Sequence, residues 1–128
     1  MSTGTIVNIL LVLFVVWMLY RMFAPIKGLN QLQDEPFRSK MEQSKNKQLI
    51  DVREVHEFKK GHISGAVNIP LAHIEGRSAD ISKNGDVFVY CQSGMRSKQA
   101  AKILLKNGCK EVNNLSGGIS SWTGSRNK

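Results

Sequence analysis

Apolar residues follow two different patterns along the chain. Between residues 4 and 23 they form one nearly continuous run, interrupted by Thr5, Asn8 and Arg21. Beyond residue 28 they fall into short groups separated by polar and glycine-containing stretches. A helix of about 20 apolar residues crosses the hydrocarbon core of a bilayer. The pattern therefore predicts a transmembrane helix over 4–23, a linker over 24–28, a globular domain over 29–124 and a C-terminal tail over 125–128.

Two alternatives for the first segment are a cleaved signal peptide and a buried core helix. Signal peptides start with a basic region and end at small residues, whereas residues 1–4 carry no basic side chain and the run ends in bulky residues. A core helix would show a polar face, which this run lacks. Basic residues lie only on its C-terminal flank, where they include Arg21, Lys27, Arg38 and Lys40. The positive-inside rule then predicts a single-pass protein of the inner or cell membrane, with its N-terminus outside and its domain in the cytoplasm.

After the linker, strand-like groups alternate with stretches of helical periodicity. Strands are predicted over residues 29–33, 48–52, 66–69, 87–90 and 111–115. Helices are predicted over residues 34–43, 53–60 and 97–107, with a broken helix over 71–82 and a short helix that carries Ile119 and Trp122. Alternation of this kind is typical of an α/β fold, in which a mainly parallel sheet has helices on both faces.

The predicted strand over 87–90 runs directly into Cys91, and a helix follows a few residues later. In a parallel sheet, this position lies at the carboxyl edge, where active sites form. Unpaired N–H groups and the helix dipole would stabilise an anion there, so a cysteine would ionise more readily than a free one. Gly94 suits a tight loop, and Arg96 adds a permanent cation. These features favour a reactive thiolate over a cysteine that only packs in the core.

Charge and cysteine content narrow the function further. The chain of 128 residues has a net charge of +8. Its lysines are scattered, with Lys59 and Lys60 as the only adjacent basic pair, so no nucleic-acid partner is predicted. Two cysteines in a cytoplasmic domain do not make a disulfide framework. Cys109 follows the predicted helix over 97–107, far from Cys91, and is expected to be structural.

No metal or cofactor is predicted. His56, His62 and His73 have no ligand-like spacing with Cys91, and His62 is expected to make a structural hydrogen bond. The pair Gly117–Gly118 lacks the spacing and the lysine of a phosphate-binding loop.

Several motifs, taken together and in order, resemble those of a rhodanese domain. They are Leu49-Ile-Asp51-Val-Arg53-Glu54, Glu57-Phe58, Gly61-His62-Ile63-Ser-Gly65-Ala66-Val-Asn68-Ile69-Pro70, Cys91-Gln-Ser-Gly94-Met-Arg96-Ser97 and Leu115-Ser-Gly117-Gly118-Ile-Ser-Ser-Trp122. The resemblance runs from about residue 29 to residue 122 and leaves the apolar N-terminal segment outside. The whole chain looks like a bacterial single-domain rhodanese on a membrane anchor.

The resemblance implies a five-stranded parallel sheet and a thiosulfate sulfurtransferase. The Cys91 thiolate would take sulfane sulfur from a donor such as thiosulfate and hold it as a persulfide, which cyanide or a thiol would then accept. The persulfide would lie in a bowl of N–H groups, stabilised as in an oxyanion hole. The residues implied to form that bowl are Gln92, Ser93, Gly94, Met95, Arg96 and Ser97. Asp51 and Arg53 would support the loop, or would only tie neighbouring loops together.

Two other functions are consistent with the same residues. Cysteine phosphatases and arsenate reductases place the loop arginine six positions after the cysteine, whereas Arg96 follows Cys91 by five, which predicts a loop better suited to a sulfur atom. A persulfide carrier or binding module, serving a membrane-associated protein partner of unknown identity, would use the same cysteine without turning over small donors. Anchoring would concentrate the persulfide near such a partner.

Overall fold

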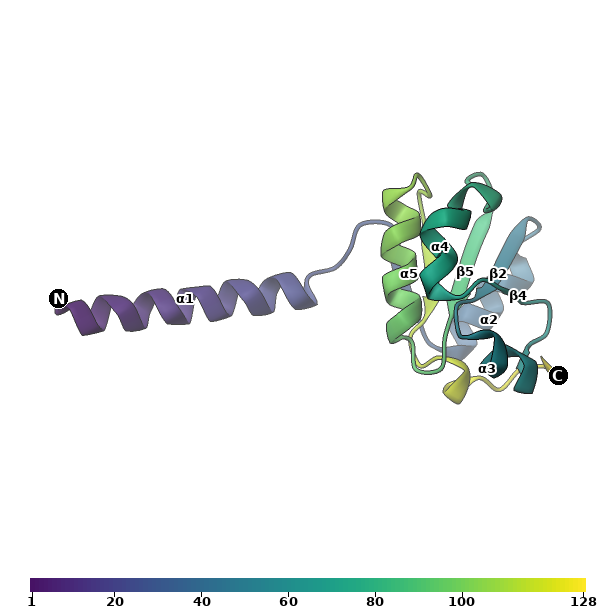
Figure 1. Ribbon diagram of the computed structural model, residues 1–128, viewed down its shortest axis with the longest axis horizontal. Coiled ribbons are helices and arrows are strands. Elements are labelled where there is room, and N and C mark those ends of the chain that lie inside the picture. Colours follow the sequence, from purple (N-terminus) through teal and green to yellow (C-terminus); the bar gives the residue numbers. More distant parts are fainter.

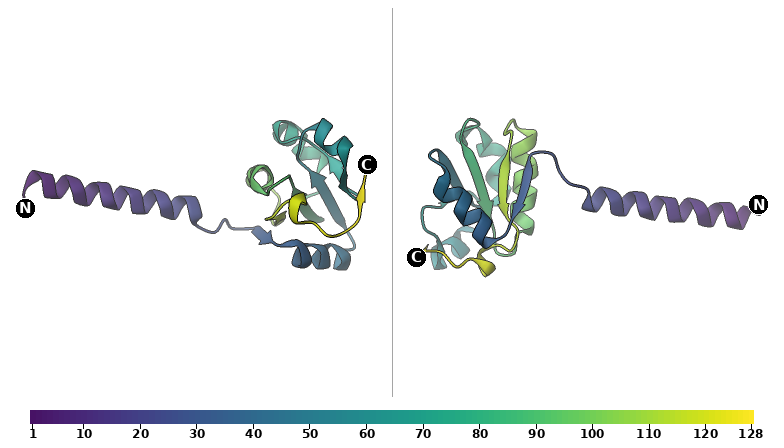
Figure 2. Two further views of the ribbon diagram at one scale, coloured as in Figure 1. Left: turned by 90° about the horizontal axis from the view of Figure 1, so that it is seen from below. Right: turned by 180° about the vertical axis from the view of Figure 1, so that it is seen from behind.

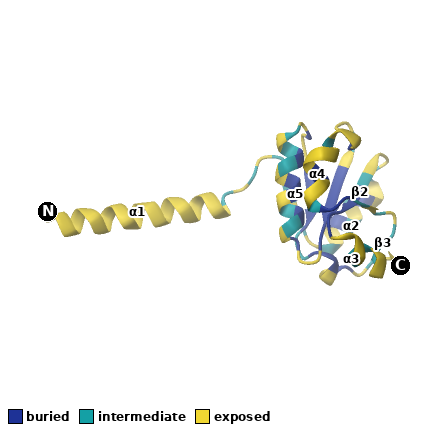
Figure 3. Ribbon diagram, in the orientation of Figure 1, coloured by how far each residue is buried: buried dark blue, intermediate teal, exposed yellow.

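The computed structural model describes residues 1–128 and contains an isolated helix followed by one α/β domain (Figure 1). Helix α1 (Thr3–Phe23) buries none of its residues, and Figure 3 shows it exposed along its whole length. Its 21 residues are long and apolar enough to cross a membrane. At 1.5 Å per residue they extend about 31 Å, close to the thickness of a bilayer's hydrocarbon core. The domain forms its core without α1.

The sheet of the domain is five-stranded and entirely parallel. Its strands are β1 (Leu29–Leu32), β2 (Lys47–Asp51), β4 (Val67–Asn68), β5 (Asp86–Tyr90) and β6 (Val112–Leu115). They lie in the order β1-β6-β5-β2-β4, so β5 is central. All four residues of β5 after Asp86 are buried, as expected for a strand covered on both faces. The predicted fold class is confirmed.

Helices cover both faces of this sheet. The main helices and 3-10 turns are α2 (Asp34–Gln43), α3 (Val55–Lys60), α4 (Leu71–Arg77), η1 (Ser78–Asp80), α5 (Met95–Lys106) and η2 (Ile119–Ser121). Helices α4 and α5 pack on one face, with Ile74 and Leu104 buried among the strand residues. Helix α2 and the segment after β6 pack on the other face, through Phe37 and Trp122. Figure 2 shows α2 and α5 on opposite sides of the sheet.

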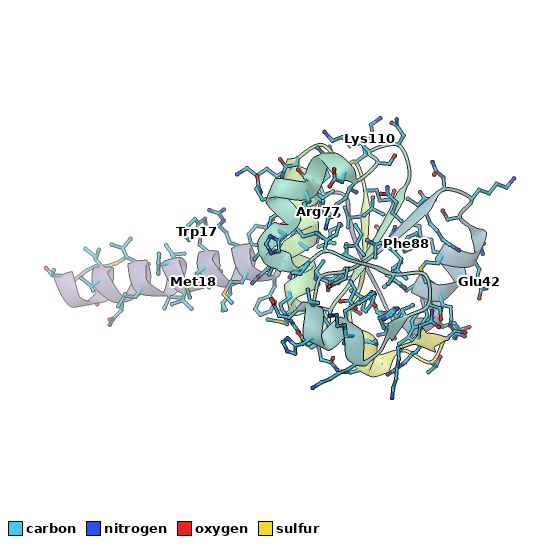
Figure 4. The ribbon with its side chains drawn as sticks, turned by 45° about the vertical axis from the view of Figure 1, so that its right-hand side comes forward. Trp17, Met18, Glu42, Arg77, Phe88 and Lys110 are labelled. Atoms are coloured by element: carbon cyan, nitrogen blue, oxygen red, sulfur yellow. The ribbon has the colours of Figure 1, made fainter.

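Phe88 illustrates how the domain is held together. It is fully buried and makes an edge-to-face contact with Phe37, whose ring also meets Trp122 edge-on. In Figure 4, Phe88 lies inside the domain, whereas Trp17 and Met18 lie on α1, outside the domain. The aromatic contacts join α2, the middle of β5 and the C-cap of η2 on one face of the sheet.

Most predicted elements are confirmed, including the broken helix, which is α4 followed by η1. Two helix starts differ. The predicted helix over 53–60 begins only at Val55, because the Glu54 and Glu57 side chains form a capping box that fixes the first turn there. The predicted helix over 97–107 begins two residues earlier, at Met95, because Gly94 takes the N-cap position.

The domain also contains a small two-stranded antiparallel ribbon, which was not predicted from the sequence. Strand β3 (His62–Ile63) pairs with β7 (Arg126–Asn127), the latter inside the segment expected to be a tail. Ser64 N–H also donates to the Ser125 carbonyl at 3.1 Å. The ribbon therefore holds residues 125–127 against the domain.

Candidate active site

Cys91 lies directly after the central strand, in the position expected from the sequence. Its side chain and backbone are fully buried. The Cys91 carbonyl accepts a hydrogen bond of 2.9 Å from the Ile119 N–H, so the segment after β6 supports the loop. The chain then turns through Gln92 and Ser93 before α5 begins.

The Cys91 Sγ atom sits in a nest of hydrogen-bond donors. The Gly94 N–H donates to it at 3.0 Å and the Ser97 hydroxyl at 3.4 Å. Burial by itself would raise the pKa of the thiol, but hydrogen bonds from the Ser97 hydroxyl and from the N–H groups of Ser97, Gly94 and Ser93 outweigh it. The pKa of Cys91 therefore lies below the usual thiol value, and the site favours a thiolate.

Gly94 is the residue that makes this nest geometrically feasible. Its φ angle is 100°, in the region that side chains strongly disfavour. A Cβ atom at this position would also overlap the Ser116 carbonyl. The Gly94 carbonyl accepts from the Asn114 side-chain amide at 3.2 Å, which connects the loop to β6. Loop curvature and close packing against β6 thus both need glycine here.

Arg96 is held by a carboxylate, which limits what it can do for a substrate. Its two terminal nitrogens donate to the two carboxylate oxygens of Glu57, at 2.7 and 3.0 Å. The guanidinium therefore joins the first turn of α5 to α3 as a bidentate ion pair. This pairing with Arg96 is the main reason that the pKa of Glu57 falls to about 2. Arg96 shapes the loop, and its charge is already balanced.

The Glu57–Arg96 ion pair predicts a specific pH dependence of stability. The pKa of Glu57 is depressed in the folded state from 4.5 to about 2, so its contribution is complete above about pH 4.5 and is lost as the pH falls toward 2. Because the pair is partly exposed, we expect this loss to be about 1 kcal/mol of the free energy of unfolding. Urea unfolding of the wild type and Glu57→Gln at pH 6 and pH 3 measures it. In Glu57→Gln, the free energy of unfolding should not show the loss of about 1 kcal/mol between pH 6 and pH 3 that the wild type shows. The control is Glu35→Gln, at an exposed site without an ion pair, which should show the same loss as the wild type.

Asp51 and Arg53 form a buried ion pair at the end of β2. The Arg53 guanidinium donates to both Asp51 carboxylate oxygens, with the shortest distance 2.7 Å, and also to the Gly61 carbonyl at 2.7 Å. It reaches the loop only through a long contact of 3.4 Å with the Gln92 side-chain oxygen. The Asn68 side chain bridges the carbonyls of Asp51 and Arg53. These contacts tie the end of β2 to β4 and to Gly61, the C-cap residue of α3.

Removing Arg53 is expected to destabilise the domain strongly. Arg53→Met leaves the fully buried Asp51 carboxylate without its cation, and such losses cost about 3–5 kcal/mol. Chemical denaturation measures the change. The matched control is Arg77→Met, which breaks the exposed ion pair with Asp80 and should cost less than about 1 kcal/mol. Equal effects of the two variants would contradict a structural role for the buried pair.

The remaining predicted residues occupy different positions around the nest. Gln92 donates from its side chain to the Ser120 hydroxyl at 2.9 Å, and Ser97 is fully buried beneath the thiol. Met95 is 71% exposed, so its side chain lies outside the nest, and the contribution predicted for this residue is that of its backbone N–H. His62 makes the expected structural hydrogen bond, to the Phe58 carbonyl at 3.0 Å, and stacks on the Phe58 ring.

Two residues important for the loop were missed from the sequence. Glu57 belongs to a quoted motif, but nothing in its spacing indicated that it would meet Arg96. Asn114 lies in a fully buried strand. A polar amide at such a position needs a hydrogen-bond partner, so this residue type could have indicated a structural contact there. Both act across long sequence separations, so local patterns do not reveal their partners.

A family model described as a rhodanese-like domain matches residues 34–125. The chain belongs to the rhodanese family. This match includes Cys91 and its whole loop and ends one residue before β7. The rhodanese fold expected from the sequence motifs, with its five-stranded sheet, is confirmed.

Comparisons with individual proteins agree with this assignment. The uncharacterized protein YqhL of Bacillus subtilis is 41% identical over 122 residues, covering 95% of this chain and 94% of YqhL, so the likeness includes most of α1. The thiosulfate sulfurtransferase GlpE of Shewanella oneidensis is 38% identical over 85 residues, covering 64% of this chain and 81% of GlpE. The crystal structure of a rhodanese-like domain protein from Staphylococcus aureus superposes with a TM-score of 0.67 at 28% identity, covering 75% of this chain and 93% of that one. Sulfur transfer of the rhodanese type is therefore the general chemistry of its relatives.

Proposed function

We propose that this rhodanese is a sulfurtransferase that moves sulfane sulfur from a donor such as thiosulfate to cyanide or a thiol through a persulfide on Cys91. The observation that carries the proposal is the environment of Sγ. A buried sulfur atom accepts hydrogen bonds from Gly94 and Ser97 at the end of a central strand, and its pKa is lowered. A cysteine that only packs in a core does not need such donors. The name of the relative GlpE supports thiosulfate as the donor.

The proposed reaction has two balanced steps. The Cys91 thiolate attacks the outer sulfur of thiosulfate, the S–S bond of thiosulfate breaks, and sulfite leaves with the electron pair. In the second step, cyanide or a thiolate attacks the outer persulfide sulfur, and the electron pair of the broken S–S bond returns to Sγ. The outer sulfur of the persulfide carries negative charge, which the donors from residues 92–97 would stabilise. No general base is proposed, because the hydrogen bonds to Sγ lower the pKa of the thiol and favour the thiolate.

Phosphate chemistry has less support at this site. A phosphatase needs its loop arginine to bind the equatorial oxygens of a tetrahedral phosphate. Arg96 instead makes two hydrogen bonds to Glu57. The spacing of five positions between Cys91 and Arg96 also favours the smaller sulfur substrate.

A persulfide carrier is the second candidate function, and one observation favours it. Met95 is 71% exposed directly beside the loop, and an unbranched apolar side chain at that position suits contact with a protein partner. In this alternative, Cys91 would hold sulfur for a membrane-associated partner and would not turn over small donors.

The deciding experiment uses the full chain in a non-ionic detergent. Thiosulfate is added, the intact mass is recorded, sulfite is quantified, and transfer to cyanide and to a small thiol is followed. One added sulfur per chain, with matching sulfite and continued turnover, supports the sulfurtransferase. A stable adduct without turnover supports the carrier, and no adduct together with hydrolysis of p-nitrophenyl phosphate would overturn both.

We also infer that α1 anchors the protein in the inner or cell membrane, with the N-terminus outside and the rhodanese domain in the cytoplasm. The length and composition of α1, its full exposure and the basic residues that follow it support this proposal. We expect the chain to stay with membranes after an alkaline wash and a deletion of residues 4–20 to become soluble. Protease added to intact cells should leave the domain uncut, and cleavage of the domain there would reverse the topology.

A further inference from the structure

A polar cavity of about 530 Å³ opens beside the Cys91 loop. The proposed transfer of sulfur from the donor to Cys91 does not assign a role to this cavity. It begins at Gln92, the residue after the nucleophile, and extends toward the β3–β7 ribbon. Charged side chains line most of it, from Arg53, Glu57, Lys60, Arg126 and Lys128. Ile119 is its only hydrophobic lining residue. The volume is that of a site for a small organic molecule, and the lining disfavours an apolar one.

The charges of this cavity do not balance. Arg53 is neutralised by Asp51, and Glu57 is neutralised by Arg96. Lys60 and Arg126 have no carboxylate within ion-pair distance, because the five ion pairs of the structure involve neither residue. Arg126 donates only to neutral groups, the carbonyls of Ile119 and Trp122, at 2.9 and 3.0 Å. The cavity therefore presents unpaired positive charge beside Gln92, the residue that follows Cys91.

The position of Arg126 is fixed by the fold. Arg126 pairs with Ile63 and Asn127 pairs with His62 in the β3–β7 ribbon, and the Ser64 hydroxyl adds a side-chain hydrogen bond to Asn127 at 3.2 Å. The family match ends at residue 125, so this cation lies outside the part of the chain that the family model describes. A cation held on a strand loses little freedom when it binds an anion.

We propose that this cavity is the acceptor subsite of the enzyme and that it selects small thiols that carry carboxylates. This proposal rests on the sulfurtransferase function proposed above. Lys60 and Arg126 bind the carboxylates, and the thiolate of the acceptor approaches past Gln92. It attacks the outer sulfur of the Cys91 persulfide, a new S–S bond forms on the acceptor, and the electron pair of the old S–S bond returns to Sγ. The products are the acceptor persulfide and the Cys91 thiolate.

The kinetic test compares two acceptors with the full chain in a non-ionic detergent. Mercaptosuccinate carries two carboxylates, and 2-mercaptoethanol carries none. Lys60→Gln and Arg126→Gln should each lower kcat/KM for mercaptosuccinate about tenfold. This is the loss expected when one charge-assisted hydrogen bond to a carboxylate is removed. Both variants should leave kcat/KM for 2-mercaptoethanol within about twofold of wild type. Arg126→Lys should recover part of the loss, and high salt should reduce the wild-type preference for mercaptosuccinate.

Lys106→Gln is the matched control, because it removes one exposed cation at the far end of α5. It should leave kcat/KM for both thiols unchanged. Equal losses for both thiols in the Lys60 and Arg126 variants would assign those residues a structural role and overturn the subsite. No loss with mercaptosuccinate would also overturn it.

A binding experiment separates this proposal from the proposed activity. Succinate, which has no thiol, is titrated into the Cys91→Ser chain, and the backbone amide NMR signals of Gly61, Gln92 and Asn127 are followed. The subsite predicts saturable shifts at these amides that Arg126→Gln abolishes. Absence of shifts would overturn the subsite even if wild-type persulfide forms. Shifts without any persulfide in the wild type would instead refute the sulfurtransferase function and leave an anion site.

Discussion

Cys91→Ser is expected to take up no sulfur from thiosulfate and to lose sulfur transfer completely. The persulfide is a covalent bond to Sγ, and a serine hydroxyl at ordinary pH supplies neither the thiolate nor a stable sulfur adduct. The hydroxyl is smaller but can accept the hydrogen bonds that the Gly94 N–H and the Ser97 hydroxyl now give to Sγ. The fold should therefore be retained. Intact mass after thiosulfate treatment and sulfite release measure the loss, and circular dichroism checks the fold.

Cys109→Ser is the matched control for this prediction. Cys109 is the other free, buried cysteine, but burial raises the pKa of its thiol instead of lowering it. It lies after α5, at the opposite end of that helix from the loop. We expect Cys109→Ser to form persulfide and release sulfite at the wild-type rate. An adduct that persists in Cys91→Ser and disappears in Cys109→Ser would overturn the assignment of the nucleophile.

Gly94→Ala is expected to lower the rate of persulfide formation about a hundredfold, a typical cost of losing one donor to a developing anion. Its N–H lies 3.0 Å from Sγ, and the added methyl would overlap the Ser116 carbonyl, so the loop must move. The positive φ angle adds about 1 kcal/mol of strain, and the overlap adds about 1–3 kcal/mol more. Stopped-flow measurement of sulfite release gives the rate, and urea unfolding gives the stability.

The control for Gly94→Ala is Gly65→Ala. Gly65 has a similar φ angle of 89°, but a Cβ atom there would meet nothing within 4 Å. It should show the conformational strain alone, about 1 kcal/mol, with persulfide formation unchanged. If both variants lost stability equally and kept the wild-type rate, the contact between the Gly94 loop and Ser116 would have no role in forming the thiolate nest.

The elements that sequence analysis predicted well are those whose signals are local. The apolar run that became α1, the alternation of strands and helices, and the cysteine after an apolar strand all depend on neighbouring residues. Helix starts were less accurate where the conformation or the side-chain hydrogen bonds of a capping residue decide the first turn. Glu57 closes the capping box that delays α3 to Val55, and Gly94 starts α5 at Met95. Such caps stabilise one start over another by only about 1 kcal/mol.

The contacts that define the candidate site were not predictable in the same way. The sequence placed Arg96 near an anion, but the structure gives its guanidinium to Glu57, 39 positions earlier. It also suggested a support role for Asp51 and Arg53, and the structure shows them as a buried pair with one long contact to Gln92. The fold alone brings Glu57 to Arg96, whereas Asp51 lies two positions from Arg53 and the fold decided that their ion pair is buried.

The amino-acid sequence was sufficient to determine the class of fold and the apolar first helix, and it singled out Cys91 as the candidate nucleophile and Gly94 as the glycine of its loop. These follow from local hydrophobic periodicity and from backbone conformations that few residues adopt. Which charges are balanced and which remain free became clear only from the folded structure. It paired Arg96 with Glu57, buried Arg53 against Asp51, and placed Arg126 beside the loop by pairing β7 with β3. Electrostatic pairing depends on the distance between two charges and on their burial, and the folded chain sets both.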